Sequence, residues 1–267
     1  MKKKRADELL VEQNLLANKE EALSYIMAGK VFTNKEIRIL TPGEKLKADT
    51  QLYIKGLEKK YVSRGGFKLE KAISTFDIDL KEKIVLDIGA STGGFTDVSL
   101  KNGAKKVYAL DVGTNQLAWE LRSHEQVIVM EQQNFRYSLL EDFKEGRPEF
   151  ATIDVSFISL AMIFPSLYPI LSEDGEVVAL IKPQFEARRE EVGEGGIIRD
   201  PQVYESVLNN VIKIAEEEKF KLKGLSISPI QGTKGNIEFL AYFTKRDSKE
   251  LVRDQLIEDL LKEENLI

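Results

Sequence analysis

Residues 83–95 read Lys-Ile-Val-Leu-Asp-Ile-Gly-Ala-Ser-Thr-Gly-Gly-Phe, a short apolar run that passes through an aspartate into a glycine-rich loop. Glycine allows the backbone to turn sharply and to approach a ligand closely. The dinucleotide-binding fingerprint is not met, because Ser91 stands where its second glycine belongs, and no Gly-Lys-Ser/Thr follows to form a phosphate loop. Asp87, directly before the loop, suits a cationic ligand and would lie badly beside a pyrophosphate.

Further apolar runs follow, each ending in a charged residue, at 106–111, 150–154 and 177–182. Helical patterns lie between the runs, as at 96–101 and 160–171. Apolar strands separated by helices indicate a parallel sheet covered on both faces, with ligands beyond the carboxyl ends of the strands. Later elements are expected as strands at 220–226 and 237–243 and a closing helix at 247–264. The fold class is therefore α/β, with a Rossmann-like sheet in residues 83–267.

The first 58 residues follow a different pattern, expected as helices at 5–14 and 19–28 and strands at 30–33, 36–40 and 51–54. Asn18 is a plausible N-cap, with Glu21 three residues later, and Gly29 stands where a helix end favours a left-handed residue. This pattern predicts a small α+β domain at 1–58. Residues 59–82 are assigned to a linker and the first helix of the second domain.

Charge is unevenly distributed along the chain. The net charge is −5, which at first argues against a nucleic-acid partner. Residues 1–60, however, carry 13 Lys and Arg against 9 Asp and Glu, whereas the rest of the chain carries 26 against 35. A positive end can mark a nucleic-acid-binding module, and it can equally be an ordinary solvated surface.

The absence of cysteine excludes disulfides, a thiolate nucleophile and cysteine metal ligands, and the single histidine, His124, excludes a histidine cluster. We therefore expect no metal site. No apolar run approaches the roughly 18 residues of a membrane helix, and the first residues lack the apolar core of a signal peptide. A cytoplasmic protein without membrane contact is expected.

Asp111 ends the second apolar run, 24 residues after Asp87, near the position from which an acidic side chain binds ribose hydroxyls. An acidic residue before a glycine loop, together with a ribose-binding acid, fits S-adenosylmethionine, which carries an ammonium, a sulfonium and a ribose but no phosphate. The alternative is a tight structural turn in another kind of α/β domain.

The kind of atom that accepts the methyl group can be inferred by elimination. Methylation of a pyrimidine C5 usually needs a cysteine nucleophile, which this chain lacks. Methylation of an amino group usually brings an Asn/Asp-Pro-Pro-aromatic signature, whereas residues 154–157 read Asp-Val-Ser-Phe. A hydroxyl oxygen remains. Lys182, Asp154 and Glu238 fall at one sheet edge, where a lysine among carboxylates can assist proton loss from a hydroxyl.

Four motifs together resemble the TlyA family, at residues 62–69, 87–97, 154–160 and 181–186. Its members are called hemolysins and act as ribosomal RNA 2′-O-methyltransferases, with a catalytic domain similar to the FtsJ class. The resemblance implies the Lys-Asp-Lys-Glu tetrad of that class at Lys68, Asp154, Lys182 and Glu238. Spacing alone does not identify Lys68.

The resemblance also implies the binding sites. The cofactor residues would be Asp87, Gly89, Ser91, Thr92, Gly93, Gly94, Phe95, Asp111, Val112, Asn134 and Asp154, with Asp111 at the ribose and Asn134 near the adenine. The front domain resembles the alpha-L RNA-binding fold, and the RNA-binding residues would be Arg5, Lys19, Lys30, Lys35 and Arg64. Where that fold usually has Val-Asn-Gly, residues 32–35 read Phe-Thr-Asn-Lys.

The expected function is S-adenosylmethionine-dependent methylation of a ribose 2′-hydroxyl, that of a cytidine, in ribosomal RNA or ribosomal subunits. Residues 186–200, with three glycines, are predicted to form a mobile loop that closes on RNA. The alternatives are a non-catalytic RNA-binding or ribosome-assembly factor and a membrane-lysing hemolysin. A pseudouridine synthase with a similar front domain has no place for the loop at 87–95. No prediction of oligomeric state follows from the sequence.

Overall fold

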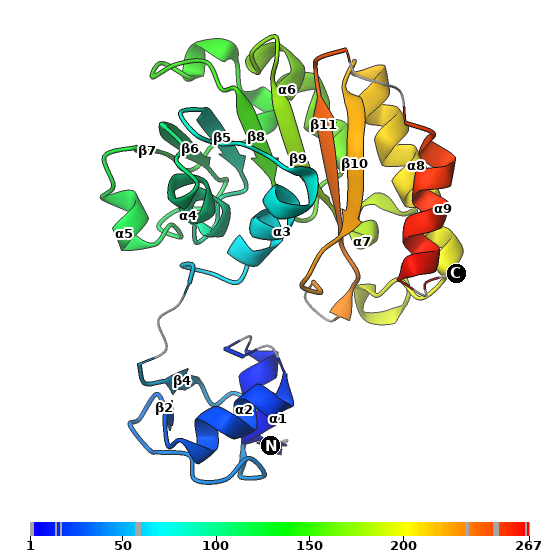
Figure 1. Ribbon diagram of the computed structural model, residues 1–267. Coiled ribbons are helices and arrows are strands. Elements are labelled where there is room, and N and C mark those ends of the chain that lie inside the picture. Colours follow the sequence, from blue (N-terminus) through cyan, green and yellow to red (C-terminus); the bar gives the residue numbers. More distant parts are fainter. Residues whose placement is uncertain are drawn as a thin grey trace. The chain divides into compact units, whose positions relative to one another are not determined.

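The computed structural model describes residues 3–13, 15–16, 18–56, 60–232, 235–247, 251–264 and 266. The chain divides into two compact units, Met1–Lys60 and Tyr61–Ile267, which are coloured from blue to cyan and from cyan to red in Figure 1. The second unit therefore takes up α3 (Gly66–Phe76), the helix that lies ahead of the sheet in sequence.

The first unit holds two helices and two small antiparallel sheets: α1 (Ala6–Glu12), α2 (Lys19–Met27), β1 (Lys3–Arg5) paired with β3 (Lys45–Lys47), and β2 (Val31–Thr33) paired with β4 (Leu52–Ile54). Its core is a small apolar cluster that includes Leu9, Leu10 and Ile26. The predicted N-cap is confirmed, because the side chain of Asn18 accepts a hydrogen bond from the backbone N–H of Glu21 at 2.9 Å.

The strand predicted at 36–40 is wrong, since among these residues only Arg38 forms a bridge, to Phe32. The Thr33 hydroxyl instead accepts hydrogen bonds from the backbone N–H groups of Lys35 and Ile37, both at 3.3 Å. Glu36 adopts a left-handed backbone with φ 61°. A hydroxyl and a left-handed glutamate thus form the turn for which the related fold uses Asn-Gly. The pairing of β1 with β3 was not predicted.

The second unit confirms the predicted α/β sheet, with seven strands in the order β10-β11-β9-β8-β5-β6-β7. The parallel strands are β5 (Ile84–Ile88), β6 (Lys106–Leu110), β7 (Val127–Met130), β8 (Phe150–Ile153) and β9 (Glu176–Ile181). β11 (Phe239–Thr244) is antiparallel to β9, and β10 (Lys221–Ile227) is antiparallel to β11. Figure 1 shows β10 and β11 at one edge and β7 at the other.

The remaining helices are α4 (Gly94–Lys101), α5 (Trp119–Arg122), α6 (Phe164–Ile170), α7 (Pro183–Glu186), α8 (Pro201–Glu217) and α9 (Arg253–Glu263). Short 3₁₀ helices lie at Phe135–Tyr137, Leu140–Asp142, Leu160–Met162, Arg189–Glu191 and Glu194–Gly196. The single helix predicted at 160–171 is therefore a 3₁₀ turn followed by α6. β7 and α8 were not predicted.

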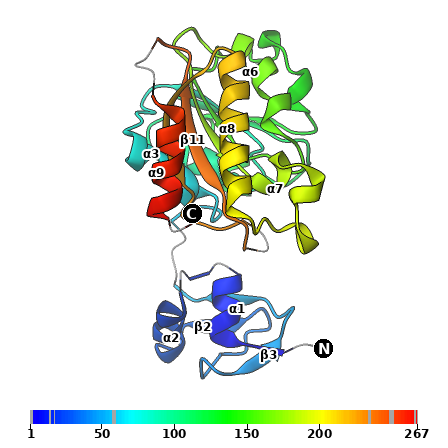
Figure 2. The same cartoon turned by 90° about the vertical axis from the view of Figure 1, so that its right-hand side faces the viewer.

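Helices cover both faces of the sheet, because neighbouring residues of one strand belong to different cores. Val178 packs in the cluster that includes α3 and α4, whereas Val177 and Ala179 pack in the cluster that includes α6, α8 and α9. Figure 2 shows α8 and α9 side by side over the sheet. Full burial on both faces explains why these strands read as continuous apolar runs.

Asp87 is completely buried, although the sequence places it directly before the cofactor loop. Its Oδ2 accepts a hydrogen bond from the Thr96 hydroxyl of α4 at 2.7 Å, and its Oδ1 accepts one from the Thr152 hydroxyl of β8 at 3.0 Å. Burial raises the pKa of Asp87 to about 6. Asp87 therefore joins a strand and a helix beneath the loop through both of its carboxylate oxygens.

The substitution Asp87→Asn is predicted to change the pH dependence of stability. Between pH of about 4 and about 6, the unfolded chain releases the Asp87 proton while the folded chain retains it, so the wild type loses stability as the pH rises. For a pKa of about 6 in the folded state, this loss is about 3 kcal/mol. Urea unfolding at pH 4 to 7 should show that the substitution removes this slope, because an amide does not titrate. Parallel curves for both proteins would contradict the assignment.

Candidate functional site

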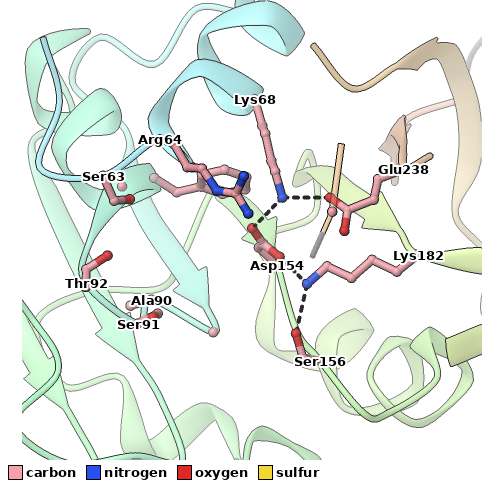
Figure 3. A pocket seen from close by; sticks show the side chains of 15 residues that line it. Ser63, Arg64, Lys68, Ala90, Ser91, Thr92, Asp154, Ser156, Lys182 and Glu238 are labelled. Carbon is pink, nitrogen blue, oxygen red and sulfur yellow. Dashed lines mark hydrogen bonds and ion pairs between the residues drawn. The ribbon is translucent and has the colours of Figure 1, made fainter. Parts of the chain in front are cut away.

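A pocket of about 360 Å³ opens at the edge of the sheet where the parallel strands end (Figure 3). Its volume lies in the range of small-molecule sites. The residues that line it come from α3 and the segment before it, the loop after β5, the start of α4, the segments after β8 and β9, and the segment before β11: Ser63, Arg64, Gly65, Lys68, Gly89, Ala90, Ser91, Thr92, Gly94, Phe95, Asp154, Ser156, Lys182, Gly232 and Glu238.

The four residues of the expected tetrad meet in this pocket (Figure 3). The Nζ of Lys68 lies 2.7 Å from Oε2 of Glu238 and 3.4 Å from Oδ2 of Asp154. The Nζ of Lys182 lies 2.6 Å from Oδ1 of Asp154. Asp154 therefore bridges two ammonium groups through its two oxygens. Each position follows from the topology: Asp154 and Lys182 directly follow β8 and β9, while Glu238 directly precedes the antiparallel β11.

The partners of Lys182 differ in one respect from the prediction. The sequence predicted Lys182 among the carboxylates of Asp154 and Glu238. In the structure Glu238 binds Lys68, and the second partner of Lys182 is the Ser156 hydroxyl, at 3.0 Å from Nζ. Ser156 lies two residues after Asp154 in the same loop, so one segment supplies both partners.

The network contains two ammonium groups and two carboxylates, and its side chains are largely buried. Lys68, Lys182 and Glu238 are all less than 10% exposed. Burial raises the pKa of Asp154, but the ammonium groups of Lys68 and Lys182 outweigh it and hold the pKa below its ordinary value. Asp154 is thus ionised at neutral pH and orients both lysines. Two ammonium groups with limited access to water can stabilise an oxyanion that develops beside them.

The loop after β5 approaches the tetrad through its backbone. Gly89 has φ 86°, and a Cβ at this position would lie 2.6 Å from the carbonyl oxygen of Asp154. Gly93 has φ 96° directly before α4. Glycine is therefore required at 89 by both its left-handed backbone and its close approach to Asp154, so the loop and the tetrad are held in register.

Several predicted cofactor residues lie outside the residues that line the pocket. These are Asp87, Gly93, Asp111, Val112 and Asn134. Asp111 accepts hydrogen bonds from the backbone N–H groups of Ser91, at 2.8 Å, and Gly113, at 2.7 Å, and so shapes the loop. Val112 is 69% exposed, and the exposed Asn134 caps a 3₁₀ helix by accepting a hydrogen bond from the N–H of Arg136.

Some residues of the pocket were not predicted. Ser63, Gly65 and Ser156 lie within the motifs at 62–69 and 154–160, and those motifs were the available signal for them. Nothing in the sequence indicated Gly232, because its position in the pocket depends on the path of the chain before β11. Arg64, expected to bind RNA, lines the pocket, and Figure 3 shows its guanidinium directed inward near Lys68.

Phe157 is an unusually exposed aromatic residue in the loop that carries Asp154 and Ser156. Its side chain is 91% exposed, and its φ of 63° is left-handed. The Phe157 ring packs against the Phe185 ring in a tilted arrangement, with 5.0 Å between the ring centroids. The Nζ of Lys182 lies 5.9 Å from the centroid of that same Phe185 ring. The exposed Phe157 ring is thus linked to the tetrad lysine through the Phe185 ring.

The expected RNA-binding residues of the first unit have different surroundings. The Arg5 guanidinium pairs with both carboxylate oxygens of Asp7, and Lys19 pairs with Glu8. The Nζ of Lys30 lies 5.8 Å from the centroid of the Tyr25 ring. Lys35 is exposed in the turn formed by Thr33. The pairs of Arg5 and Lys19 leave both cations about half exposed or more, so both remain accessible to phosphate.

Metal sites and membrane spans can be assessed for the part of the chain that the structure describes. Among these residues, no group of three or more His, Cys, Asp and Glu side chains could hold a metal ion. Within the same ranges, no helix has the length and apolar character needed to span a membrane.

Comparison with known proteins places the chain in a family. A family profile described as FtsJ-like methyltransferase matches residues 61–245. A Bacillus subtilis protein with the provisional name rRNA methyltransferase YqxC is 56% identical over 90% of this chain and 85% of its own length. The 16S/23S rRNA (cytidine-2′-O)-methyltransferase TlyA of Mycobacterium tuberculosis is 38% identical over 92% of both chains.

A solved structure supports the same assignment. A Streptococcus thermophilus protein with a provisional hemolysin name superposes with a TM-score of 0.77 at 50% identity, covering 99% of this chain and 98% of its own. These comparisons confirm the family that the sequence motifs predicted. They also confirm the predicted methyltransferase fold. The chain belongs to the TlyA family of FtsJ-like methyltransferases.

Proposed function

We propose that this chain transfers a methyl group from S-adenosylmethionine to the 2′-hydroxyl of a cytidine in ribosomal RNA. The observation that carries the proposal is the network of Lys68, Asp154, Lys182 and Glu238, which shares one pocket with the glycine loop. The cytidine and the ribosomal RNA come from the name of the Mycobacterium tuberculosis relative, which aligns along 92% of both chains.

The residues around the loop fit S-adenosylmethionine by their chemistry. The pocket offers the hydroxyls of Ser63, Ser91 and Thr92 and the guanidinium of Arg64. These groups suit the carboxylate and ammonium of an amino-acid tail. Each oxygen of Asp111 accepts one backbone hydrogen bond and keeps a lone pair for a ribose hydroxyl. When bound, S-adenosylmethionine supplies a methyl group that its sulfonium charge activates.

The rest of the proposed cofactor site is formed by residues of the loop and of the neighbouring strand ends. Gly89, Gly94 and Phe95 line the pocket, and Gly93 and Asp87 support the loop from outside it. We assign the adenine to the region of Val112 and Asn134, beyond β6 and β7. Val112 offers an exposed apolar surface there.

Lys182 is the residue to which we assign stabilisation of the negative charge that develops on the 2′-oxygen. Two of its three N–H groups point to Asp154 and Ser156, so one remains for the substrate. At that position the ammonium N–H stabilises the 2′-oxygen, which takes the methyl group while its proton passes to water and the sulfur of the cofactor keeps the bonding electrons. Lys68 holds Asp154 and Glu238, so its role is to fix the carboxylate on which Lys182 depends.

Recognition of the nucleotide is assigned to the exposed edge beside Lys182. A base that leaves its stack can be received on an aromatic face, and Phe157 presents such a face next to the tetrad. We therefore propose that Phe157 stacks on an unpaired base of the RNA while Lys182 faces the ribose.

The segment at 186–200 remains our candidate for closure on RNA. Gly195 and Gly196 have positive φ, and a Cβ added at either position would meet no other atom within 4 Å. One end is fixed, because the buried Asn236 side chain donates to the carbonyl of Gly196 and accepts from the N–H of Ile198.

Replacement of Lys182 with alanine is predicted to lower methyl transfer from labelled S-adenosylmethionine to ribosomal RNA by at least about 100-fold. Cofactor affinity, measured by calorimetry, should change little, because Lys182 lies on the substrate side of the network. The control is Lys223→Ala, which removes a lysine paired with Glu176 on β9 and outside the pocket. Substantial turnover by the Lys182→Ala protein would remove Lys182 from this role.

Replacement of Lys35 with alanine is predicted to weaken binding to naked ribosomal RNA and to reduce the salt dependence of that binding. A lost phosphate contact should lower the slope of log affinity against log salt by about one. Cofactor affinity should not change. The control is Lys213→Ala, at an exposed lysine of α8. An unchanged slope for Lys35→Ala would exclude a phosphate contact there.

A further inference from the structure

Glu186 links the helix that follows Lys182 to the loop that carries Phe157. The helix α7 starts directly after Lys182 and ends at Glu186. The Glu186 carboxylate accepts two hydrogen bonds, from the Ser159 hydroxyl at 2.6 Å and from the backbone N–H of Leu160 at 2.8 Å. Both donors belong to the segment that follows Phe157.

The loop at 154–160 is thus joined to the segment from Lys182 to Glu186 on both sides of Phe157. Before Phe157, Asp154 and Ser156 bind Lys182. After Phe157, Ser159 and Leu160 bind Glu186. The exposed Phe157 lies between these links.

The conformation of Phe157 needs such support. A bulky residue with φ of 63° is strained and persists only where its surroundings hold it. Burial does not hold the Phe157 side chain, which is 91% exposed. Its contact with the Phe185 ring covers a small part of it. Val155 and Ile158 anchor the loop by packing against the core, and the hydrogen bonds on either side of Phe157 fix the exposed part between them.

Glu186 is suited to this task because it is largely withdrawn from water. Burial raises the pKa of Glu186, and the hydrogen bonds from Ser159 and Leu160 offset part of that effect. A carboxylate in such surroundings is held to its donors more strongly than one in solvent. Glu186 does not line the pocket, so it does not contact the reacting atoms.

We propose that Glu186 is a positioning residue that holds Phe157 in its exposed, left-handed conformation, ready to stack on an unpaired base of the RNA substrate. This inference rests on the proposed function. Loss of a stacking contact weakens ground state and transition state alike, so it raises KM for RNA without changing kcat.

The test compares Glu186→Ala and Glu186→Gln in methyl transfer to ribosomal RNA. The alanine variant should raise KM for RNA about tenfold, which is the size of one lost base–aromatic stack, with kcat and cofactor affinity unchanged. The glutamine variant should recover most of the loss, because its amide oxygen can still accept the Leu160 N–H. An unchanged KM in the alanine variant, or equal effects of both substitutions, would overturn the proposal.

A double-mutant cycle separates positioning from general destabilisation. Phe157→Ala should raise KM by itself, and adding Glu186→Ala should raise it no further. Additive increases, or a normal KM for Phe157→Ala, would overturn the proposal. If Glu186→Ala fails to bind cofactor and so is misfolded, Ser159→Ala replaces it in the cycle, since it removes one of the two donors.

The matched control is Glu176→Gln, which alters another largely buried carboxylate at the opposite end of β9, where Lys83 pairs with it. It should lower thermal stability and leave KM for RNA unchanged; a raised KM in this control would assign the Glu186 effect to general destabilisation. Absence of methyl transfer by the wild type would reject the proposed function itself. Transfer by the wild type with normal KM in the Glu186 variants would reject this inference alone.

Discussion

The carboxylate of Asp154 accepts ion pairs from two largely buried lysines, and the arrangement of the catalytic unit depends on it. Two ammonium groups this close to one another would repel without a negative charge between them. The backbone of the same residue is in contact with the loop after β5, where only glycine fits at position 89. One residue thereby fixes the relative positions of the charge network and the proposed cofactor loop.

The topology explains how distant segments reach this residue. Asp154 and Lys182 follow adjacent parallel strands, which end at the same edge. Glu238 reaches that edge because β11 runs antiparallel and so begins there. Lys68 comes from α3, which covers one face of the sheet ahead of β5. A network assembled from four elements needs the whole unit to be folded.

Much of this could be predicted from the sequence. Apolar runs ending in charged residues indicated the parallel strands, and with them Asp154 and Lys182, because strand burial and the carboxyl-edge rule act locally. Lys68 needed the family resemblance, since its position on a helix face carries no strand signal. The Ser156 contact and the burial of Asp87 depend on tertiary packing between β8, α4 and the end of β9. The false strand at 36–40 arose because the alternation of Ile37 and Ile39 resembles a strand, whereas Thr33 and Glu36 impose a turn.

The central claim is that the tetrad acts on a ribose oxygen. The most direct measurement digests ribosomal RNA after reaction with the purified chain and S-adenosylmethionine and identifies the methylated nucleoside by mass spectrometry. The account predicts 2′-O-methylcytidine, with the methyl group on the ribose fragment. A methyl group on the base fragment, or no methylated nucleoside despite cofactor binding, would contradict it.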